Sequence, residues 1–354
     1  MPTSPASDLT DADQAGELAD RIAQAAAAAR PLRIVGGGTR AAYGRPVAGE
    51  PLEVAGHRGV VAYDPSELVI TARAGTPVAE IERALAAQGQ MLAFEPPAFG
   101  QGGTVGGMVA TGLSGPRRPF SGALRDHVLG AKILDGRGRT LSFGGTVFKN
   151  VAGFDAFRLM AGSLGCLGVI LEVSLRVFPR PRAEAALAFE LPGESARLRT
   201  VELMRRPLPL SGAFHDGERL HLRLSGGEAA VRAAQAELGG EAEDLSLWTA
   251  VRDLAHPRLR APVLWRISTP PTARLPFPTL WDWGGAQHWL PAQEVDPAVW
   301  GAAQAVGGHA ALVRGGSDRI FQPLPEALFA LHRRIKAGLD PAGVLNPGRM
   351  YEGL

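Results

Sequence analysis

Two glycine clusters constrain this chain more than any other feature. The first, "VGGGTR" at residues 35–40, follows the short apolar run Leu32–Val35. The second, "GGTVGG" at residues 102–107, lies in a glycine-dense stretch that extends from residue 99 to residue 122. Glycine lets the backbone adopt positive φ and approach another backbone or a ligand closely. We therefore expect the main chain to come very close to something else at both clusters.

The first cluster formally satisfies the dinucleotide pattern G-x-G-x-x-A at Gly36, Gly38 and Ala41. That fingerprint also requires a helix directly after the turn. Residues 44–51 contain two glycines and two prolines instead, and no Gly-Lys-Ser/Thr of a P-loop follows. Successive N–H groups in residues 36–39 can still bind an anion without a helix. A plain turn that ends a strand is the alternative, and the cluster by itself leaves both open.

The composition is that of an ordinary soluble protein with room for two domains. The 354 residues are 45% hydrophobic and 20% charged, with a formal net charge of only +2. No dense block of lysine and arginine occurs, which argues against a nucleic-acid partner. The single cysteine, Cys166, excludes an intrachain disulfide.

We expect no secretory signal in the N-terminal region. Residues 1–20 are acidic and lack the apolar core of a secretory signal. The alanine-rich run at residues 23–29 is too short to span a bilayer. We expect a cytoplasmic protein that reaches the inner face of a membrane only through a partner.

Apolar periodicity predicts several amphipathic helices. One covers residues 13–30. A second begins after Thr76, which we expect to cap its N-terminus, and ends at Gly89. A third lies in the C-terminal tail, where its apolar face is formed by Leu328, Leu331 and Ile335.

We predict three segments. Residues 1–181 form one domain, because the prolines at positions 179 and 181 mark a boundary. Residues 182–320 contain all six tryptophans and alternate strand-like and helical patterns, which favours an α+β second domain. Residues 321–354 form the helix and turn-rich tail.

The two clusters and the segments around them resemble the PCMH-type FAD-binding fold of the vanillyl-alcohol oxidase superfamily. The resemblance covers most of residues 32–181 and the tail, through segments such as "YDPSELVITARAGTPVAEIERAL", "GSLGCLGVILEVSLRVFPRP" and "LDPAGVLNPGRM". The chain is similar to the FAD-binding subunits of bacterial glycolate oxidases in three segments, "GPRRPFSGALRDHVLG", "KNVAGFDAFRLMAGSLGCLG" and "WDWGGAQHWL". The resemblance implies an α+β fold: a two-subdomain FAD-binding domain, a smaller α+β cap domain, and a tail that returns to the FAD domain.

The resemblance also assigns contacts with FAD. Backbone N–H groups for the diphosphate would come from Gly36, Gly37, Gly38 and Thr39. The flavin and ribityl region would be lined by Pro96, Thr104, Gly106, Gly107, Ala110 and Thr111. The adenosine or ribityl part would meet Gly168, Val169 and Ile170, and the tail would return to the flavin edge with Asn346 and Arg349. Small residues suit close N–H donors for a diphosphate, and an apolar wall suits the flavin ring.

We predict that FAD binds without a covalent bond. Superfamily members with covalent FAD place a histidine near the first glycine loop or a cysteine in a later one. Thr39 occupies the first place here, and residues 103–122 contain no cysteine.

The acid–base apparatus of catalytic relatives is not recognisable. Their metal motifs, of the "GDGNxH" and "EHG" type, have no counterpart among the eight histidines, and Met108 stands where catalytic relatives often carry asparagine. The resemblance therefore implies an FAD-carrying subunit of a glycolate (2-hydroxy acid) dehydrogenase, working with a sister FAD catalytic subunit and an iron–sulfur subunit that passes electrons to quinone. We predict no metal site and assign no catalytic residue.

Two alternatives remain. The chain could be a self-sufficient flavoenzyme that holds the substrate carboxylate with Arg266, Arg314 or Arg319. It could instead be a structural subunit whose FAD does not turn over. The residues do not distinguish glycolate from D-lactate as the substrate.

Overall fold

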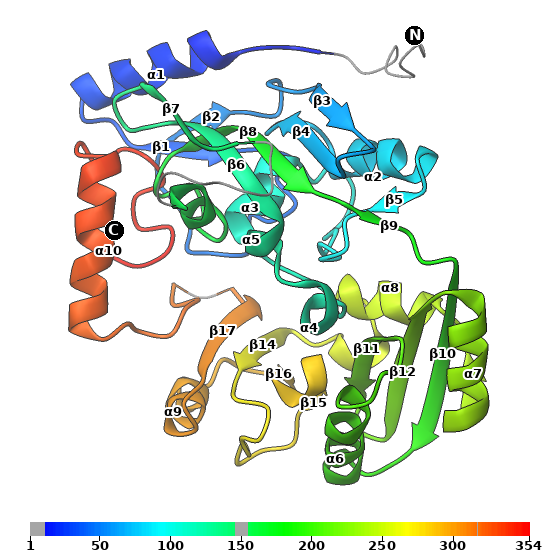
Figure 1. Ribbon diagram of the computed structural model, residues 1–354. Coiled ribbons are helices and arrows are strands. Elements are labelled where there is room, and N and C mark those ends of the chain that lie inside the picture. The colour runs from blue at the N-terminus through cyan, green and yellow to red at the C-terminus, as the bar shows by residue number, and fades with distance from the viewer. Residues whose placement is uncertain (1–10, 146–154, 317) are drawn as a thin grey trace, which may run out of the picture.

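The chain folds into two stacked parts joined by one connection and one long C-terminal helix (Figure 1). The computed structural model describes residues 11–145, 155–316 and 318–354. Strands up to residue 179 belong to the N-terminal part, and strands from residue 183 onward belong to one separate sheet. The sheet therefore changes between residues 179 and 183, and the domain boundary at residue 181 stays a prediction.

The N-terminal part contains two separate hydrophobic cores. One core lies on a five-stranded antiparallel sheet of order β3 (Val60–Asp64), β4 (Val69–Arg73), β8 (Val169–Arg176), β6 (Val128–Leu134) and β7 (Thr140–Gly144). The other core joins helix α1 to the parallel pair β1 and β2 and to the tail; their bounds are α1 (Ala15–Ala27), β1 (Leu32–Val35) and β2 (Glu50–Glu53). The two cores correspond to the two subdomains that the resemblance implies.

Short helices and one further strand pair complete the N-terminal part. Helices α2 and α3 pack on the five-stranded sheet through Ile81, Leu85, Val105 and Val109. The elements are α2 (Val78–Ala87), α3 (Val105–Thr111), α4 (Arg118–Ser121), α5 (Leu124–His127), the 3₁₀ turn η1 (Ala156–Met160), and the pair β5 (Gln90–Met91) and β9 (Phe178–Pro179).

An eight-stranded sheet forms the second part. Its strand order is β13 (Glu241–Glu243), β10 (Ala183–Glu190), β12 (Arg219–Gly226), β11 (Leu210–His215), β15 (Leu280–Asp282), β16 (Gln287–Ala292), β14 (Val263–Ser268) and β17 (His309–Arg314). The helical elements here are α6 (Gly193–Met204), α7 (Glu228–Leu238), α8 (Ser246–Arg252), α9 (Ala298–Ala305), η2 (Pro257–Leu259) and η3 (Trp283–Gly285). The predicted α+β class is confirmed.

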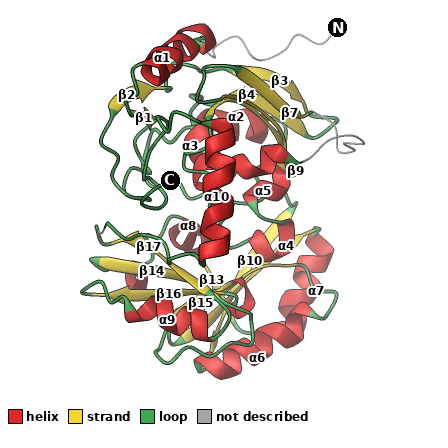
Figure 2. Cartoon of the chain, turned by 90° about the vertical axis from the view of Figure 1, so that its left-hand side faces the viewer, coloured by secondary structure: helices red, strands yellow, loops and turns green. Residues whose placement is uncertain are grey.

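The tail returns to the N-terminal part, as the resemblance implies. Helix α10 (Glu326–Leu339) runs along one side of both parts (Figure 2). After it, the Leu32 amide N donates to the Val344 carbonyl O at 2.7 Å, and the Asn346 amide N donates to the Leu32 carbonyl O at 3.0 Å. The tail therefore lies beside β1, which leads into the first glycine cluster.

The predicted apolar face of α10 is wrong. Leu328 and Leu331 are both 41% exposed, whereas Lys336 is buried. The Lys336 ammonium donates to the Cys166 carbonyl O (2.9 Å), the Leu345 carbonyl O (2.6 Å) and the Asp340 carboxylate (2.7 Å). The buried side of the helix is thus set by carbonyl groups that need a donor.

The cap predicted for α2 is also wrong. Pro77 occupies the N-cap position, and the helix begins at Val78. The Thr76 hydroxyl accepts from the Gly59 amide N at 2.9 Å and donates to the Gly59 carbonyl O at 3.1 Å. Thr76 therefore joins two loops instead of capping a helix, while Gly89, with φ 65°, ends the helix as predicted.

Candidate cofactor-binding site

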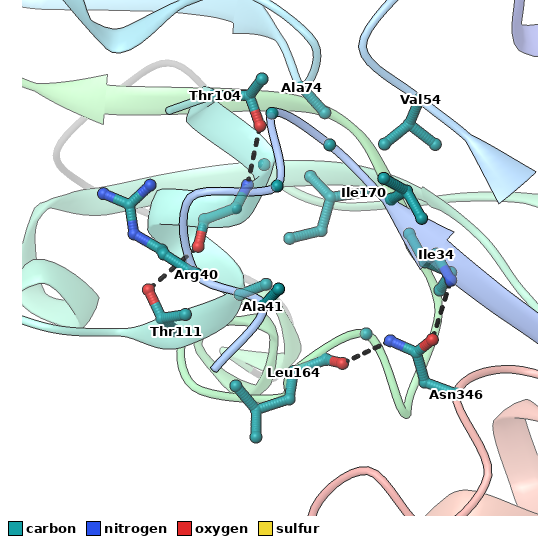
Figure 3. A pocket seen from close by; sticks show the side chains of 18 of the residues that line it. Ile34, Arg40, Ala41, Val54, Ala74, Thr104, Thr111, Leu164, Ile170 and Asn346 are labelled. Carbon is teal, nitrogen blue, oxygen red and sulfur yellow. Dashed lines mark hydrogen bonds between the residues drawn. The ribbon is translucent and has the colours of Figure 1, made fainter. Parts of the chain in front are cut away.

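The two glycine clusters meet at one cavity in the N-terminal part (Figure 3). Every residue that we assign to FAD lines this cavity except Pro96. The assigned lining residues are Gly36, Gly37, Gly38, Thr39, Thr104, Gly106, Gly107, Ala110, Thr111, Gly168, Val169, Ile170, Asn346 and Arg349. Strand β1, helix α3, strand β8 and the tail thus contribute to a single site.

Pro96 is buried outside the cavity, so the structure does not bring it to the other assigned residues. The preceding residue, Glu95, has φ 50°, and its carboxylate accepts from the Arg117 amide N at 2.9 Å and from Arg223 Nη1 at 2.8 Å. This ion-pair network draws the segment toward the second part of the molecule. The next residue, Pro97, supports the cavity from outside, because its carbonyl O accepts from Arg40 Nη2 at 2.6 Å.

The glycines of the two clusters are needed first for contact between the loops. A Cβ on Gly37 would lie 1.6 Å from the Gly102 carbonyl O, and a Cβ on Gly36 would lie 2.6 Å from Thr104 Oγ1. Gly106 packs in the same way, since its Cβ would lie 2.8 Å from the Cβ of Ala74. At these positions, the close contact that the sequence predicts is made between two segments of this chain, not with a ligand.

Gly38 differs from its neighbours. It has φ 73°, and a Cβ built on it would meet no atom within 4 Å. Its backbone is therefore left-handed and free of packed protein where the loop lines the cavity. This combination suits a close backbone contact with a ligand.

Two threonines of the site use their hydroxyl groups locally. Thr104 is the N-cap of α3, and its Oγ1 accepts from the Gly107 amide N at 3.3 Å. The Thr111 hydroxyl donates to the Gly107 carbonyl O at 2.9 Å. These bonds, drawn in Figure 3, fix the helix whose residues Gly106, Gly107 and Ala110 face the cavity.

Arg40 is a cavity residue that our sequence reasoning missed. It is only 9% exposed, and burial lowers the pKa of its guanidinium to about 10, so it stays charged at neutral pH. Its Nε has no hydrogen-bond partner among the described residues, and none of those residues forms an ion pair with it. A buried cation without a counterion is costly, and a bound anion would compensate it. The sequence signal that could have identified Arg40 is its position directly after "GGGT".

Asn346 and Arg349 line the cavity but use their polar atoms within the protein. The Asn346 side-chain amide accepts from the Ile34 amide N at 2.8 Å and donates to the Leu164 carbonyl O at 2.7 Å. The Arg349 guanidinium donates to the carbonyl oxygens of Arg45 (2.7 Å) and Tyr43 (3.0 Å). Both side chains fix the loop and strand that form the cavity wall.

The remaining wall is apolar. It is formed by Ile34, Val54, Ala74, Ala110, Leu164, Val169 and Ile170. Glycine-rich backbone and a buried cation at one side, with an aliphatic wall at the other, match the anionic diphosphate and the largely apolar ring of a flavin nucleotide. The residues present therefore fit this cofactor.

Comparison with known proteins gives a full-length relative. The chain is 48% identical over 350 residues to the glycolate oxidase subunit GlcE of Escherichia coli (strain K12), covering 98% of this chain and 100% of the relative. The chain belongs to the glycolate oxidase subunit GlcE family. The family model described as "FAD binding domain" matches residues 10–144, and the cofactor is FAD.

Other relatives match shorter stretches of this GlcE-family chain. The D-lactate dehydrogenase of Archaeoglobus fulgidus is 33% identical over 150 residues, which cover 42% of this chain and 34% of the relative. The glycolate oxidase subunit GlcD of Bacillus subtilis is 29% identical over 128 residues, which cover 36% of this chain and 27% of the relative. Among solved structures, an alkyldihydroxyacetonephosphate synthase aligns with a TM-score of 0.67 at 15% identity, over 94% of this chain and 75% of that chain, and shares the fold.

The described residues contain neither a membrane-spanning helix nor a metal-binding cluster. None of their helices is long and apolar enough to cross a membrane. Residues 11–145, 155–316 and 318–354 contain no group of three histidine, cysteine, aspartate or glutamate side chains that could hold a metal ion.

Proposed function

We propose that this chain is the FAD-carrying subunit of a multi-subunit glycolate dehydrogenase. The full-length identity of 48% to a glycolate oxidase subunit carries this proposal. The cavity formed by the two glycine clusters supports it, because its buried cation and apolar wall suit FAD. Bound FAD supplies a two-electron acceptor for oxidation of the hydroxy acid.

The cavity residues differ in which chemical groups they present to the cofactor, unpaired polar groups or apolar side chains. Gly38, Thr39 and Arg40 would hold the diphosphate, since the glycine backbone is open and the arginine lacks a counterion. Ala110 would exclude water from the flavin and ribityl region, and Val169 and Ile170 would do so at the adenosine or ribityl part. Binding would be noncovalent, because none of the described residues that line the cavity is a histidine or a cysteine.

The partners that we propose are a sister FAD catalytic subunit and an iron–sulfur subunit, from which electrons pass to quinone. The name of the Escherichia coli relative, a subunit, supports a complex. A single cysteine cannot hold an iron–sulfur cluster, which needs about four cysteine ligands, so the cluster belongs to a partner. We place the chain in the cytoplasm, with any membrane contact made through the complex.

Two of the three arginines named for a self-sufficient enzyme, Arg314 and Arg266, differ in what their guanidinium groups contact. Arg314 donates to the Leu259 carbonyl O at 2.9 Å and the Ala261 carbonyl O at 3.2 Å, so its guanidinium supports backbone. Arg266 makes no ion pair with the described residues and stays a candidate for carboxylate binding.

The test compares the isolated FAD-loaded chain with the reconstituted complex in a dye-reduction assay with glycolate. We expect only slow turnover from the isolated chain, because positioned acid–base groups contribute about 10²–10⁴-fold. Addition of both partners restores activity. Rapid turnover by the isolated chain would support the self-sufficient enzyme. If glycolate bleaches no flavin in this chain inside the active complex, the chain is a structural subunit.

FAD attachment is tested separately. Acid precipitation of the purified chain releases the flavin into the supernatant if the bond is noncovalent. Flavin that remains in the denatured pellet would contradict the proposal.

A further inference from the structure

Helix α10 carries an apolar stripe that the described residues leave uncovered. Leu328, Leu331 and Ile335 follow one another at intervals of three and four positions, so they lie on one side of the helix. Leu328 and Leu331 are exposed, and Ile335 is half-buried. None of the three packs into a hydrophobic core formed by the described residues. This spacing is typical of a helix that buries an apolar face, yet the structure leaves that face in water.

The helix is attached to the rest of the chain through its other side. Lys336 donates to the Cys166 and Leu345 carbonyl oxygens. The rings of Phe329 and His332 each have their centroid 6.4 Å from the centroid of Tyr351. Helix α10 lies on the outside of both parts in Figure 2, so a second protein can reach the side away from these contacts.

The two exposed leucines differ from other exposed apolar side chains. Single exposed apolar residues are common on protein surfaces, whereas a cluster indicates an interaction site. Among the described residues, Leu328 and Leu331 form the one exposed pair of large apolar side chains within a turn of a single helix; the others are Val61, Leu159, Leu198, Met204 and Leu245. Apolar anchors spaced by three, four and seven positions are those with which a helix docks into an apolar groove.

The charge beside the stripe specifies the groove further. Arg334 lies three positions after Leu331, and therefore on the same side of α10. It is exposed and makes no hydrogen bond or ion pair with a described residue. Glu326, the only acidic residue of α10, is two positions from Leu328 and five from Leu331, and these spacings place it on a different side. The helix thus presents apolar side chains and an unpaired cation, and the complementary surface is apolar with a carboxylate beside it.

This charge pattern disfavours a second copy of the chain as the occupant. Two copies of the stripe would meet with Arg334 on both sides, and α10 offers no carboxylate to either arginine. Like charges that face each other across an interface are unfavourable. A different protein therefore fits the stripe better than a second copy does.

A membrane surface also fits α10 less well than a protein groove. Helices that lie in a membrane interface carry many lysine and arginine residues on their polar face. Here Lys336 is buried inside the protein, and the Arg333 guanidinium carbon lies 6.0 Å from the ring centroid of Phe329 on the same helix. Arg334 and a short apolar stripe match a protein partner instead.

The continuation of α10 leads to the FAD cavity. Lys336 joins the helix to the Leu345 carbonyl O, and the next residue, Asn346, lines the cavity. A protein docked on α10 would therefore contact the segment whose continuation forms the cavity wall. Of the two partners in the proposed function, the iron–sulfur subunit receives the electrons and so has to lie near the flavin.

We propose that Leu328, Leu331 and Ile335 of α10 form the docking surface for the iron–sulfur subunit, which presents an apolar groove with a carboxylate beside Arg334. The leucines supply affinity through burial, and Arg334 steers and orients the partner. The identity of the partner rests on the proposed function, whereas the apolar and acidic character of its surface rests on the helix.

The experiment measures binding of the purified iron–sulfur subunit to the FAD-loaded chain by surface plasmon resonance at low and high salt. The double variant Leu328→Gln/Leu331→Gln should weaken affinity at least about tenfold, because two apolar side chains no longer gain from burial. Arg334→Glu should weaken affinity by a similar factor, mainly through a slower association rate that no longer falls as salt is added.

Two matched variants serve as controls. Leu198→Gln replaces a leucine that is 57% exposed on α6, away from the stripe. Arg333→Gln replaces the arginine next to Arg334, which points toward Phe329 instead. Both should bind the iron–sulfur subunit with wild-type affinity. All replaced side chains are exposed, so thermal unfolding should match wild type, and Arg334→Glu tests the surface independently if the leucine variant melts early.

Several results would overturn the inference. They are wild-type affinity in both the leucine variant and Arg334→Glu, no binding of the iron–sulfur subunit to wild type, and leucine-dependent binding to the sister FAD subunit instead. Leucine-dependent self-association in sedimentation, or leucine-dependent flotation with vesicles of phosphatidylcholine and phosphatidylglycerol, would assign the stripe to a second copy or to a membrane.

The same proteins separate this inference from the proposed function. If the inference fails while the assembled complex still oxidises glycolate, the proposed function stands. If docking depends on the leucines but the assembled complex does not oxidise glycolate, the docking surface stands and the proposed function is refuted.

Discussion

Substitution of Gly37 by alanine tests whether the two glycine clusters hold each other or only a ligand. The added Cβ would lie 1.6 Å from the Gly102 carbonyl O and 2.7 Å from its carbonyl C. Ordinary van der Waals contact requires the loops to separate by roughly 1.5–2 Å. The obstacle is backbone, so no side-chain rotation can relieve it, and the second cluster has to move.

The expected cost follows from this geometry. Overpacking of a well-packed site usually costs about 1–3 kcal/mol, and a rigid obstacle favours the upper end. The free energy of unfolding of a protein is about 5–15 kcal/mol, so Gly37→Ala removes a substantial fraction of it. We expect the FAD-free variant to melt several degrees below wild type and to lose FAD affinity, because both loops line the cavity.

Gly107→Ala is the matched control within the same cavity. Its Cβ would lie 3.3 Å from Thr104 Oγ1 and 3.9 Å from Arg40 Nη1, with no backbone in the way. Within a helix such as α3, alanine is also more favourable than glycine by about 1 kcal/mol. We expect normal melting of the FAD-free variant but weaker FAD binding, because the methyl group enters the cavity.

The assays are thermal unfolding of the FAD-free proteins and FAD titration followed by flavin fluorescence. The reasoning is refuted if Gly37→Ala melts with wild type, or if Gly107→Ala is destabilised as much as Gly37→Ala. Normal FAD affinity in Gly107→Ala would place the cofactor elsewhere.

Three further predictions concern charged side chains. Arg40→Gln should weaken FAD binding at least about tenfold, while the unfolding free energy of the FAD-free protein is maintained, because an uncompensated buried charge is removed; FAD titration and urea unfolding check this. Lys336→Met should lower the unfolding free energy by about 3–5 kcal/mol, because the fully buried carboxylate of Asp340 loses its counterion. The double variant that also carries Asp340→Asn should recover part of the loss. In the second part, burial lowers the pKa of His221, but its hydrogen bond with Glu243 and its ion pair with Asp216 outweigh this and raise the pKa above its ordinary 6.5. Its contribution to stability is therefore complete below pH 6.5 and is lost as the pH rises through the folded pKa, so the stability difference between wild type and His221→Gln in urea should shrink between pH 6 and pH 9; a constant difference would contradict the assignment.

Local sequence patterns predicted the elements whose neighbours are also local. Helix α1 buries Leu18 and Ile22 as its periodicity indicates. Helix α10 also forms where predicted, but its buried side follows Lys336, because carbonyl oxygens of Cys166 and Leu345 lie there. Apolar periodicity contains no information about such distant acceptors. It therefore locates a helix better than it locates the buried face of a helix at the end of a chain.

The same limit explains where the site in the structure differs from the residues assigned from the sequence. The assigned residues of the glycine clusters lie in two short segments, and all of them line the cavity. Pro96 lies outside the cavity lining because its segment follows the ion pairs of Glu95, whose partners include Arg223, far along the chain. Arg40 was missed for a related reason: its burial depends on the Pro97 carbonyl, 57 positions away.

The glycines of "VGGGTR" thus have two separate functions that the sequence alone does not distinguish. Positions 36 and 37 require glycine because Thr104 and Gly102 pack against Gly36 and Gly37. Gly38 has a left-handed backbone with open space around it. A substitution that abolishes FAD retention at either of the first two positions is therefore compatible with a cavity that binds nothing, since the loops would separate. Only changes that leave the loop contact intact, at Gly107 or Arg40, report on the ligand itself.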